Sequence, residues 1–186
     1  MNIIVSVTAA SGAIYARMLL EQLVASAQVE RIALIFSNNA HEVTTAEGVS
    51  FDAIEASPKV TTYANDNLWA STASGSARWE AMVVVPSTAG TMGRIAAGLS
   101  QTLIERSADV ILKERRRLIV VLRETPLSLI HIENMHRITA AGGIILPASP
   151  SFYAAPTSIE ELCRSVVDRI VQLLGIDSDR YEWEGR

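Results

Sequence analysis

The 186-residue sequence has few cysteines, few aromatic residues and no long apolar run. Its one cysteine, Cys163, provides neither a disulfide framework nor a thiolate metal site. The reducing cytoplasm is therefore the expected location. No apolar run approaches the length of a membrane span. The start, Met1-Asn2, lacks the charge pattern of a secretory signal, so we expect a cytoplasmic protein without a membrane partner.

Charge is also scarce, because charged residues make up 19% of the chain against 49% hydrophobic ones. A surface with so little charge predicts that part of it is covered in a homo-oligomer. The net charge of −4 and the pI near 5.4 argue against nucleic acid as a partner. The one dense basic run, 113–117, lacks interleaved aromatic residues, which agrees with that exclusion.

Short apolar runs alternate with segments of helical spacing along the whole chain. The expected strands are 3–7, 31–36, 81–85, 118–122 and 144–146, and the expected helices are 13–27, 40–47, 92–97, 100–113, 127–141 and 158–174. The polar segment 60–76 is expected to be irregular. This alternation predicts an α/β fold with a doubly wound, mainly parallel sheet in a Rossmann-like (flavodoxin-like) three-layer sandwich. We expect one domain over 1–176 and a polar tail over 177–186.

The most informative segment is 112–126, LKERRRLIVVLRETP, in which a buried strand is flanked by charge. The strand ends at Arg123-Glu124, which places a cation and a proton carrier at its carboxyl end. Ligands of open α/β sheets bind at that edge. Taken alone, the pattern also fits a solvated helix followed by an ordinary core strand.

Small, hydroxyl-rich turns follow three of the expected strands, at Thr8–Gly12, at Ser37 and at Ser87–Thr91. Backbone N–H groups at helix starts, together with hydroxyls, bind anions, so these turns predict a mononucleotide pocket. Neither Gly-x-Gly-x-x-Gly nor Gly-Lys-Ser/Thr is present. The only lysines, Lys59 and Lys113, do not follow a tyrosine at the spacing of short-chain dehydrogenases. Flavin mononucleotide (FMN) is therefore favoured over a nicotinamide cofactor.

A family resemblance rests on six motifs that occur in order along the chain. They are Thr-x-Ala-Ser-Gly-Ala-x-Tyr (8–15), Ala-Ser-Gly-Ser (73–76), Leu-Lys-Glu-Arg-Arg (112–116), Arg-Glu-Thr-Pro (123–126), His-x-Glu-Asn-Met (131–135) and Phe-Tyr (152–153). Together they resemble the flavin prenyltransferases of the UbiX/Pad1 family over nearly the whole chain. The resemblance implies transfer of a dimethylallyl group from dimethylallyl phosphate to N5 and C6 of reduced FMN. The product, prenylated FMN, would serve a UbiD-type decarboxylase.

The resemblance also implies roles for individual residues. FMN would be held by Ala9, Ala10, Ser11, Ser37, Thr88, Ala89, Gly90, Thr91 and Arg123. Dimethylallyl phosphate would be bound by Lys113, Arg123, Glu124, Tyr153 and Arg169. The catalytic set would be Glu47, Lys113, Arg123 and Glu124, with no metal. The family forms dodecamers, and sites at subunit boundaries would bring Lys113 and Arg123 together from the two ends of a strand.

Several positions depart from the family pattern, and other functions stay open. Ala9 replaces a glycine, Ser87-Thr88 a Cys-Ser pair, Leu122 a proline and Ala154 a histidine. One alternative is a non-catalytic FMN carrier or assembly subunit of a decarboxylase. Another is a related flavoprotein cysteine decarboxylase, although its Pro-x-Met-Asn-x-x-Met-Trp clamp is missing. A decarboxylase acting by itself is disfavoured because no residue set supplies a carbanion sink.

Overall fold

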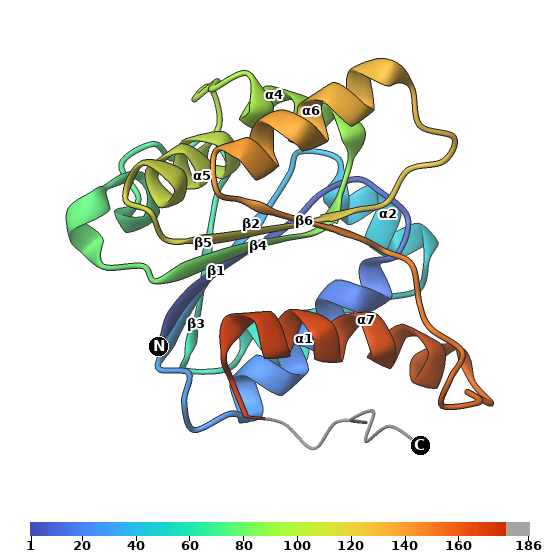
Figure 1. Ribbon diagram of the computed structural model, residues 1–186. Helices are drawn as coiled ribbons and strands as arrows, with labels where there is room; N and C mark the ends of the chain where they lie inside the picture. Colours follow the sequence, from blue (N-terminus) through green and yellow to red (C-terminus); the bar gives the residue numbers. More distant parts are fainter. Residues whose placement is uncertain (178–186) are drawn as a thin grey trace.

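A computed structural model describes residues 1–177 and shows a six-stranded, wholly parallel sheet between two layers of helices (Figure 1). Its strand order is β3-β2-β1-β4-β5-β6. The strands are β1 Asn2–Val7, β2 Arg31–Phe36, β3 Val60–Tyr63, β4 Ala81–Ser87, β5 Arg117–Leu122 and β6 Ile144–Pro147. The central strands are aliphatic and buried on both faces, as parallel sheets require. The predicted doubly wound three-layer fold is confirmed.

The helices divide between the two faces of the sheet (Figure 1). One layer holds α1 Ala13–Ala25 and α7 Ile159–Leu174, whose residues Leu19, Leu23 and Val167 belong to the core on that face. The other holds α4 Ala89–Ala96, α5 Leu103–Lys113 and α6 Leu129–Ala140, and the residues Met92 and Leu103 of these helices belong to the core on that face. Two short helices, α2 Ala40–Ala46 and α3 Asp52–Glu55, follow β2. Two 3₁₀ turns, Ser71–Ala73 and Gly75–Ala77, precede β4.

Two predictions of local structure were wrong. The segment 60–76 begins with β3, an edge strand whose central Thr61 and Thr62 are exposed, so its polarity resembled that of a loop. Helix α4 begins at Ala89 rather than Met92, because the Thr88 hydroxyl accepts a hydrogen bond from Thr91 N and caps it. The division into one domain and a tail stays a prediction. Residues 178–186, which include most of that tail, lie outside the described residues.

The chain reverses its winding between β1 and β4, and this reversal positions the site. After β1 the chain enters α1 on one face of the sheet, and after β4 it enters α4 on the opposite face. The two strands are adjacent and parallel, with Ile3 paired to Ala81 and Ser6 to Val84. A crevice therefore opens beyond their carboxyl ends, where doubly wound folds bind ligands.

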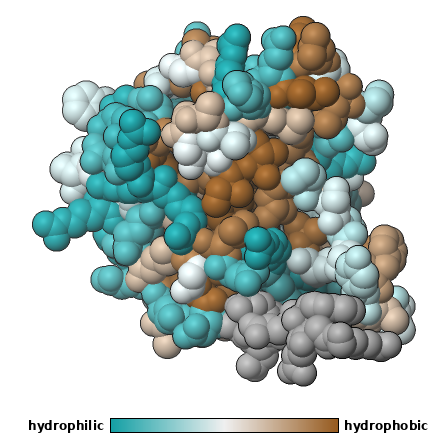
Figure 2. Space-filling view, in the orientation of Figure 1, coloured by the Kyte–Doolittle hydropathy of each residue, from teal (hydrophilic) through white to brown (hydrophobic). Residues whose placement is uncertain are grey.

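Large apolar side chains remain exposed on one side of the molecule. They gather at the start of α6 and in the loop after β6: Leu127, Leu129, Ile130, Ile132 and Phe152. Figure 2 shows this hydrophobic area over α6 and across the middle of the face. The edge strand β6 beneath it is only half-buried. Such a patch on a chain with little charge is typical of a protein interface.

Candidate functional site

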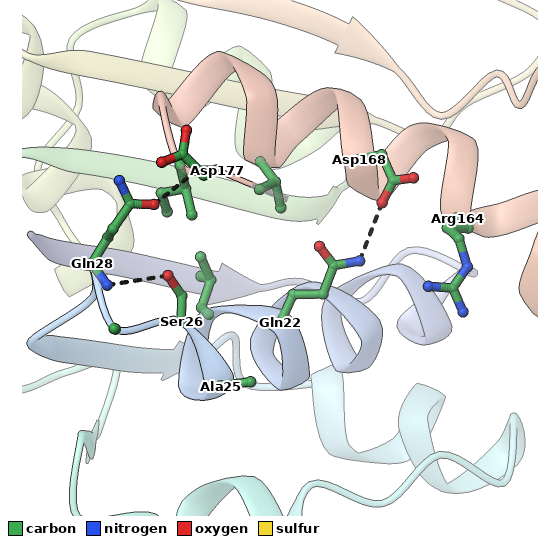
Figure 3. A pocket seen from close by; sticks show the side chains of 11 residues that line it. Gln22, Ala25, Ser26, Gln28, Arg164, Asp168 and Asp177 are labelled. Carbon is green, nitrogen blue, oxygen red and sulfur yellow. Dashed lines mark hydrogen bonds between the residues drawn. The ribbon is translucent and has the colours of Figure 1, made fainter. Parts of the chain in front are cut away.

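One hollow on the surface is lined by none of the predicted site residues. It has a volume of about 490 Å³ and lies between the end of α1 and helix α7 (Figure 3). Gln22 donates to Asp168 across it, and Arg164 lines its rim. Because α1 ends there and leads into β2, this hollow is at the amino-terminal edge of the sheet. The hollow is therefore at the opposite edge of the sheet from the crevice beyond the carboxyl ends of β1 and β4.

The three predicted turns converge at the opposite, carboxyl-terminal edge. The Thr8 hydroxyl, which is buried, donates to Pro86 O at 2.8 Å and accepts from Thr88 N at 2.9 Å. Ser37 N donates to Val7 O at 2.9 Å, which ties the turn after β2 to the end of β1. These bonds hold the turns after β1, β2 and β4 in one fixed arrangement.

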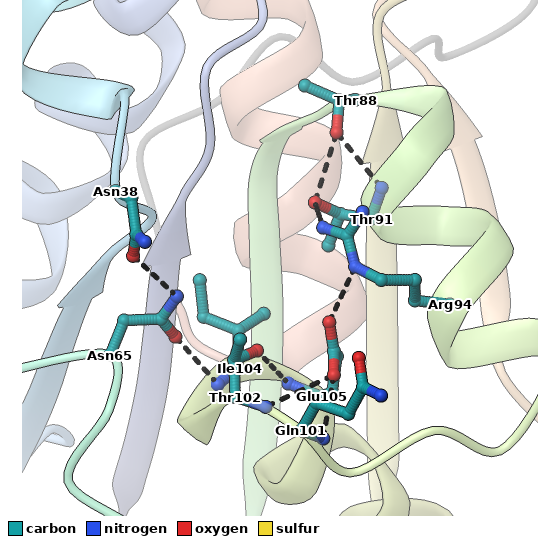
Figure 4. Close-up of polar contacts among 9 residues, drawn as sticks. All are labelled: Asn38, Asn65, Thr88, Thr91, Arg94, Gln101, Thr102, Ile104 and Glu105. Atoms are coloured by element: carbon teal, nitrogen blue, oxygen red, sulfur yellow. Dashed lines mark hydrogen bonds and ion pairs between the residues drawn. The ribbon is translucent and has the colours of Figure 1, made fainter.

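A pocket of about 370 Å³ opens between these turns and the start of α5. Four of the predicted FMN residues line it: Ala9, Ser37, Thr88 and Thr91. Figure 4 shows polar side chains that surround it, which come from the turns after β2 and β3, from α4 and its N-cap, and from the start of α5 and the residues before it. A second hollow of about 580 Å³, reaching toward His41 and Tyr63, shares Ser37, Asn38 and Asn65 with it. The hydroxyls and amides fit the ribityl phosphate of a flavin mononucleotide, and the adjoining hollow adds room for the rest of the molecule.

Other predicted FMN residues, Ala10, Ala89 and Gly90, belong to the same turns but do not line the 370 Å³ pocket. The polar residues of the pocket that sequence reasoning missed are Asn38, Asn39, Asn65, Arg94, Gln101, Thr102 and Glu105. One local signal was available for two of them. Thr102 and Glu105 have the spacing of a capping box, and each caps the backbone of the other at the start of α5.

Glu47, predicted as a catalytic carboxylate, follows α2, and its side chain reaches the start of α1. Its carboxylate accepts hydrogen bonds from Gly12 N at 2.9 Å and from Ala13 N at 2.8 Å. Burial alone would raise the pKa of Glu47, but hydrogen bonds from Ser11, Gly12 and Ala13 and the nearby charge of Arg123 outweigh it, so the pKa is lowered from 4.5. The side chain is therefore ionised at neutral pH.

We expect Glu47→Gln to lower the free energy of unfolding by about 0.5–1 kcal/mol at pH 7. A carboxylate satisfies the first turn of α1 better than a neutral amide. Because the pKa is lowered in the folded state, this contribution is full above 4.5 and is lost as the pH falls through the folded-state pKa. Urea unfolding at several pH values measures it. Equal stabilities of both proteins at pH 7 would contradict the assignment.

Arg123 and Glu124 follow β5 directly at the same edge. Arg123 N donates to Ser87 O at 3.1 Å, just beyond a register shift between β4 and β5. The charge of Arg123 acts on Glu47 and on Tyr15, whose pKa is raised to about 12, mainly by burial and also by Cys163. Glu124 is exposed, and its Oε1 accepts from Thr125 N at 3.1 Å. The crevice thus has a cation near one carboxylate, with a second carboxylate next to it in sequence.

The remaining predicted residues lie elsewhere in the same chain. Lys113 ends α5, before β5, and its Nζ lies 2.5 Å from Glu114 Oε1. Three residues and the whole of β5 therefore separate it from Arg123, and the six residues of β5 alone span about 20 Å. Tyr153 is 81% exposed in the loop after β6, and Arg169 is exposed on α7, where it donates to Gln172. One subunit alone does not bring Lys113 to the crevice.

Neither a metal-binding cluster nor a membrane-spanning helix is found in the part of the chain that the structure describes. Within 1–177, no group of three or more His, Cys, Asp or Glu side chains is placed to hold a metal ion. Among the same residues, no helix is both long and apolar enough to cross a membrane.

The fold and the crevice define the class of protein as a flavoprotein, and comparison with known proteins supports this. A family model described as Flavoprotein matches residues 1–174. Flavin prenyltransferase UbiX of Methanocaldococcus jannaschii is 42% identical over 183 residues, covering 98% of this chain and 97% of that protein. The chain belongs to the UbiX family of flavin prenyltransferases.

Solved structures agree with this membership. AnUbiX (PadA1), in complex with FMN and dimethylallyl pyrophosphate, is 37% identical with a TM-score of 0.91, over 100% of this chain and 98% of that one. A dodecameric FMN-dependent UbiX-like decarboxylase from Escherichia coli O157:H7 is 33% identical with a TM-score of 0.94, over the full length of both chains.

Proposed function

We propose that this protein is a metal-independent flavin prenyltransferase that joins the dimethylallyl group of dimethylallyl phosphate to N5 and C6 of reduced FMN. The prenylated FMN passes to a UbiD-type decarboxylase. One observation carries the proposal: a hydroxyl-lined mononucleotide pocket shares its sheet edge with the Arg123-Glu124 pair and with Glu47. A protein that only bound a mononucleotide would not need the charged residues Arg123, Glu124 and Glu47 beside the pocket.

Arg123, together with Lys113 and Arg169, neutralises the phosphate that leaves when the allylic C–O bond breaks. Glu124 donates a proton to that phosphate. Reduced FMN supplies the nucleophilic ring atoms when bound. Glu47, which is ionised at neutral pH, accepts the proton lost from the flavin ring. Tyr153 lies against the allyl cation and excludes water.

The complete site is shared between subunits of a homo-oligomer, which we propose to be a dodecamer. Lys113 and Arg123 lie at opposite ends of β5, so a single subunit cannot place both on one phosphate. The exposed apolar residues of α6 and of the loop after β6, including Phe152 and Tyr153, offer a surface for the neighbour (Figure 2). A dodecameric relative with the same fold supports this assembly.

A non-catalytic FMN carrier is the main competing function. A carrier needs the hydroxyl-lined pocket but gains nothing from a cation and an acid at its edge. A flavoprotein cysteine decarboxylase shares the general chemistry of FMN binding, but the sequence lacks its substrate clamp. The prenyltransferase is therefore the function that uses all parts of the crevice.

The deciding test is anaerobic incubation with reduced FMN and dimethylallyl phosphate, followed by mass spectrometry of the released flavin. We expect a flavin heavier by one C5H8 unit. Parallel reactions with dimethylallyl pyrophosphate identify the preferred donor. Unchanged flavin with both donors, despite tight FMN binding, would overturn the prenyltransferase and leave the carrier.

A further inference from the structure

Arg94 lies in the last turn of α4, but its guanidinium folds back over the first turn. Its Nη2 donates to Thr91 Oγ1 at 3.2 Å, and its Nη1 lies 3.4 Å from the position that a Cβ on Gly90 would occupy. The Thr88 and Thr91 hydroxyls are hydrogen-bonded to each other at 3.0 Å beside it. A full positive charge therefore reinforces the partial positive charge of the α4 N-terminus.

Glu105 holds this arginine in place from α5. The two side chains meet at 2.5 Å between Arg94 Nε and Glu105 Oε1, and Glu105 is only 1% exposed, whereas Arg94 is 45% exposed. The second carboxylate oxygen accepts from Gln101 N at 2.9 Å and from Thr102 N at 3.1 Å. Figure 4 shows this chain of contacts from the start of α5 to the Arg94 guanidinium. The carboxylate is fixed by backbone groups, so the guanidinium that it binds is fixed as well.

Arg94 lines the pocket and keeps donors that these hydrogen bonds do not use. A guanidinium has five N–H donors, and the hydrogen bonds above involve Nε and Nη2. Among residues 1–177, no acceptor is hydrogen-bonded to Nη1. Arg94 lines the 370 Å³ pocket together with Ser37, Thr88 and Thr91. A pre-positioned cation with free donors, surrounded by hydroxyls, suits a phosphate group.

We propose that Arg94 binds the 5′-phosphate of the flavin, with Glu105 as the positioning residue that aims its guanidinium. This inference rests on the proposed FMN site and adds to it a charged residue that none of the predicted FMN residues supplies at the phosphate end. The two arginines then bind different phosphates. Arg94 binds the phosphate of the flavin, whereas Arg123 binds the phosphate of the dimethylallyl donor. An arginine present only to neutralise Glu105 would not change flavin affinity.

The test compares two ligands that differ only in the phosphate. Dissociation constants of FMN and riboflavin are measured by quenching of flavin fluorescence for wild type, Arg94→Met and the control Arg17→Met, which removes a half-buried arginine paired with Glu21 on α1. We expect Arg94→Met to weaken FMN binding about ten- to a hundredfold and to leave riboflavin binding unchanged. The Arg17 variant should bind both ligands like wild type.

Arg94→Met leaves a buried carboxylate without its partner, so the double variant Arg94→Met/Glu105→Gln provides a neutral, better-folded comparison. We expect it to show the same selective loss of FMN affinity. Glu105→Gln alone should weaken FMN binding less than Arg94→Met does, because the guanidinium remains but is no longer held in a fixed position. Equal loss of FMN and riboflavin affinity, or no loss of either in the double variant, would overturn the proposal.

A final measurement separates this proposal from the proposed function. At saturating FMN, the KM for dimethylallyl phosphate should be unchanged in Arg94→Met, because Arg94 does not contact the donor. A raised KM with unchanged FMN affinity would assign Arg94 to the donor phosphate and overturn the inference. Absence of prenyl transfer in wild type would count against the prenyltransferase, while the FMN-to-riboflavin comparison would still test Arg94.

Discussion

Glu124→Gln should reduce prenyl transfer by about a hundred- to ten-thousandfold and leave FMN affinity close to that of wild type. The amide has the shape of the carboxylic acid, but it cannot give a proton to the departing phosphate. Glu124 is exposed, and it accepts a hydrogen bond from Thr125 N in its own turn, so the fold should tolerate the change. Single-turnover reactions with reduced FMN, analysed by mass spectrometry, measure the rate.

The matched control is Glu21→Gln, an exposed carboxylate on α1 that pairs with Arg17 away from the crevice. It should transfer the prenyl group at the wild-type rate. A Glu124→Gln enzyme that keeps more than about a tenth of the wild-type rate would assign the proton transfer to another group.

Two inactive variants should restore activity when they assemble together. Lys113→Met and Glu124→Gln each remove one part of the phosphate site, and β5 separates the two positions within a chain. In a mixed oligomer, some sites receive Lys113 from one variant and Glu124 from the other. Random assembly of equal amounts gives about a quarter of intact sites, so about a quarter of wild-type activity is expected.

Co-expression with two affinity tags, followed by tandem purification, yields the mixed oligomers for this assay. The control is the pair Arg123→Met with Glu124→Gln. These residues are adjacent in sequence and come from the same subunit, so no mixed site contains both native side chains. Mixed Lys113 and Glu124 variants that remain as inactive as this control pair would show that Lys113 does not complete a neighbour's site.

The sequence was most informative where burial dictates residue type. Strands β1, β4 and β5 are mostly aliphatic because both of their faces are covered, and each was predicted within two residues of its observed ends. Strand β3 escaped prediction because it is a four-residue edge strand with exposed threonines. Periodicity cannot distinguish such a short, polar strand from a loop.

The candidate site shows the same contrast between local and long-range information. The hydroxyl-rich turns are local, and four of their residues do line one pocket. The contact between Glu47 and the start of α1 joins positions 35 residues apart, and only family resemblance suggested a role for this residue. The Arg94–Glu105 pair joins two helices at a distance set by tertiary packing, so nothing in the local pattern around Arg94 indicated it.

The position of Glu47 also bears on which nucleotides the crevice can accept. In dinucleotide-binding sheets of this strand order, the pyrophosphate occupies the N-terminus of the first helix. Here a carboxylate of the chain itself already takes the Gly12 and Ala13 N–H groups. A bridging pyrophosphate would have to displace it against like-charge repulsion. We therefore expect the crevice to bind a mononucleotide more tightly than a dinucleotide such as FAD.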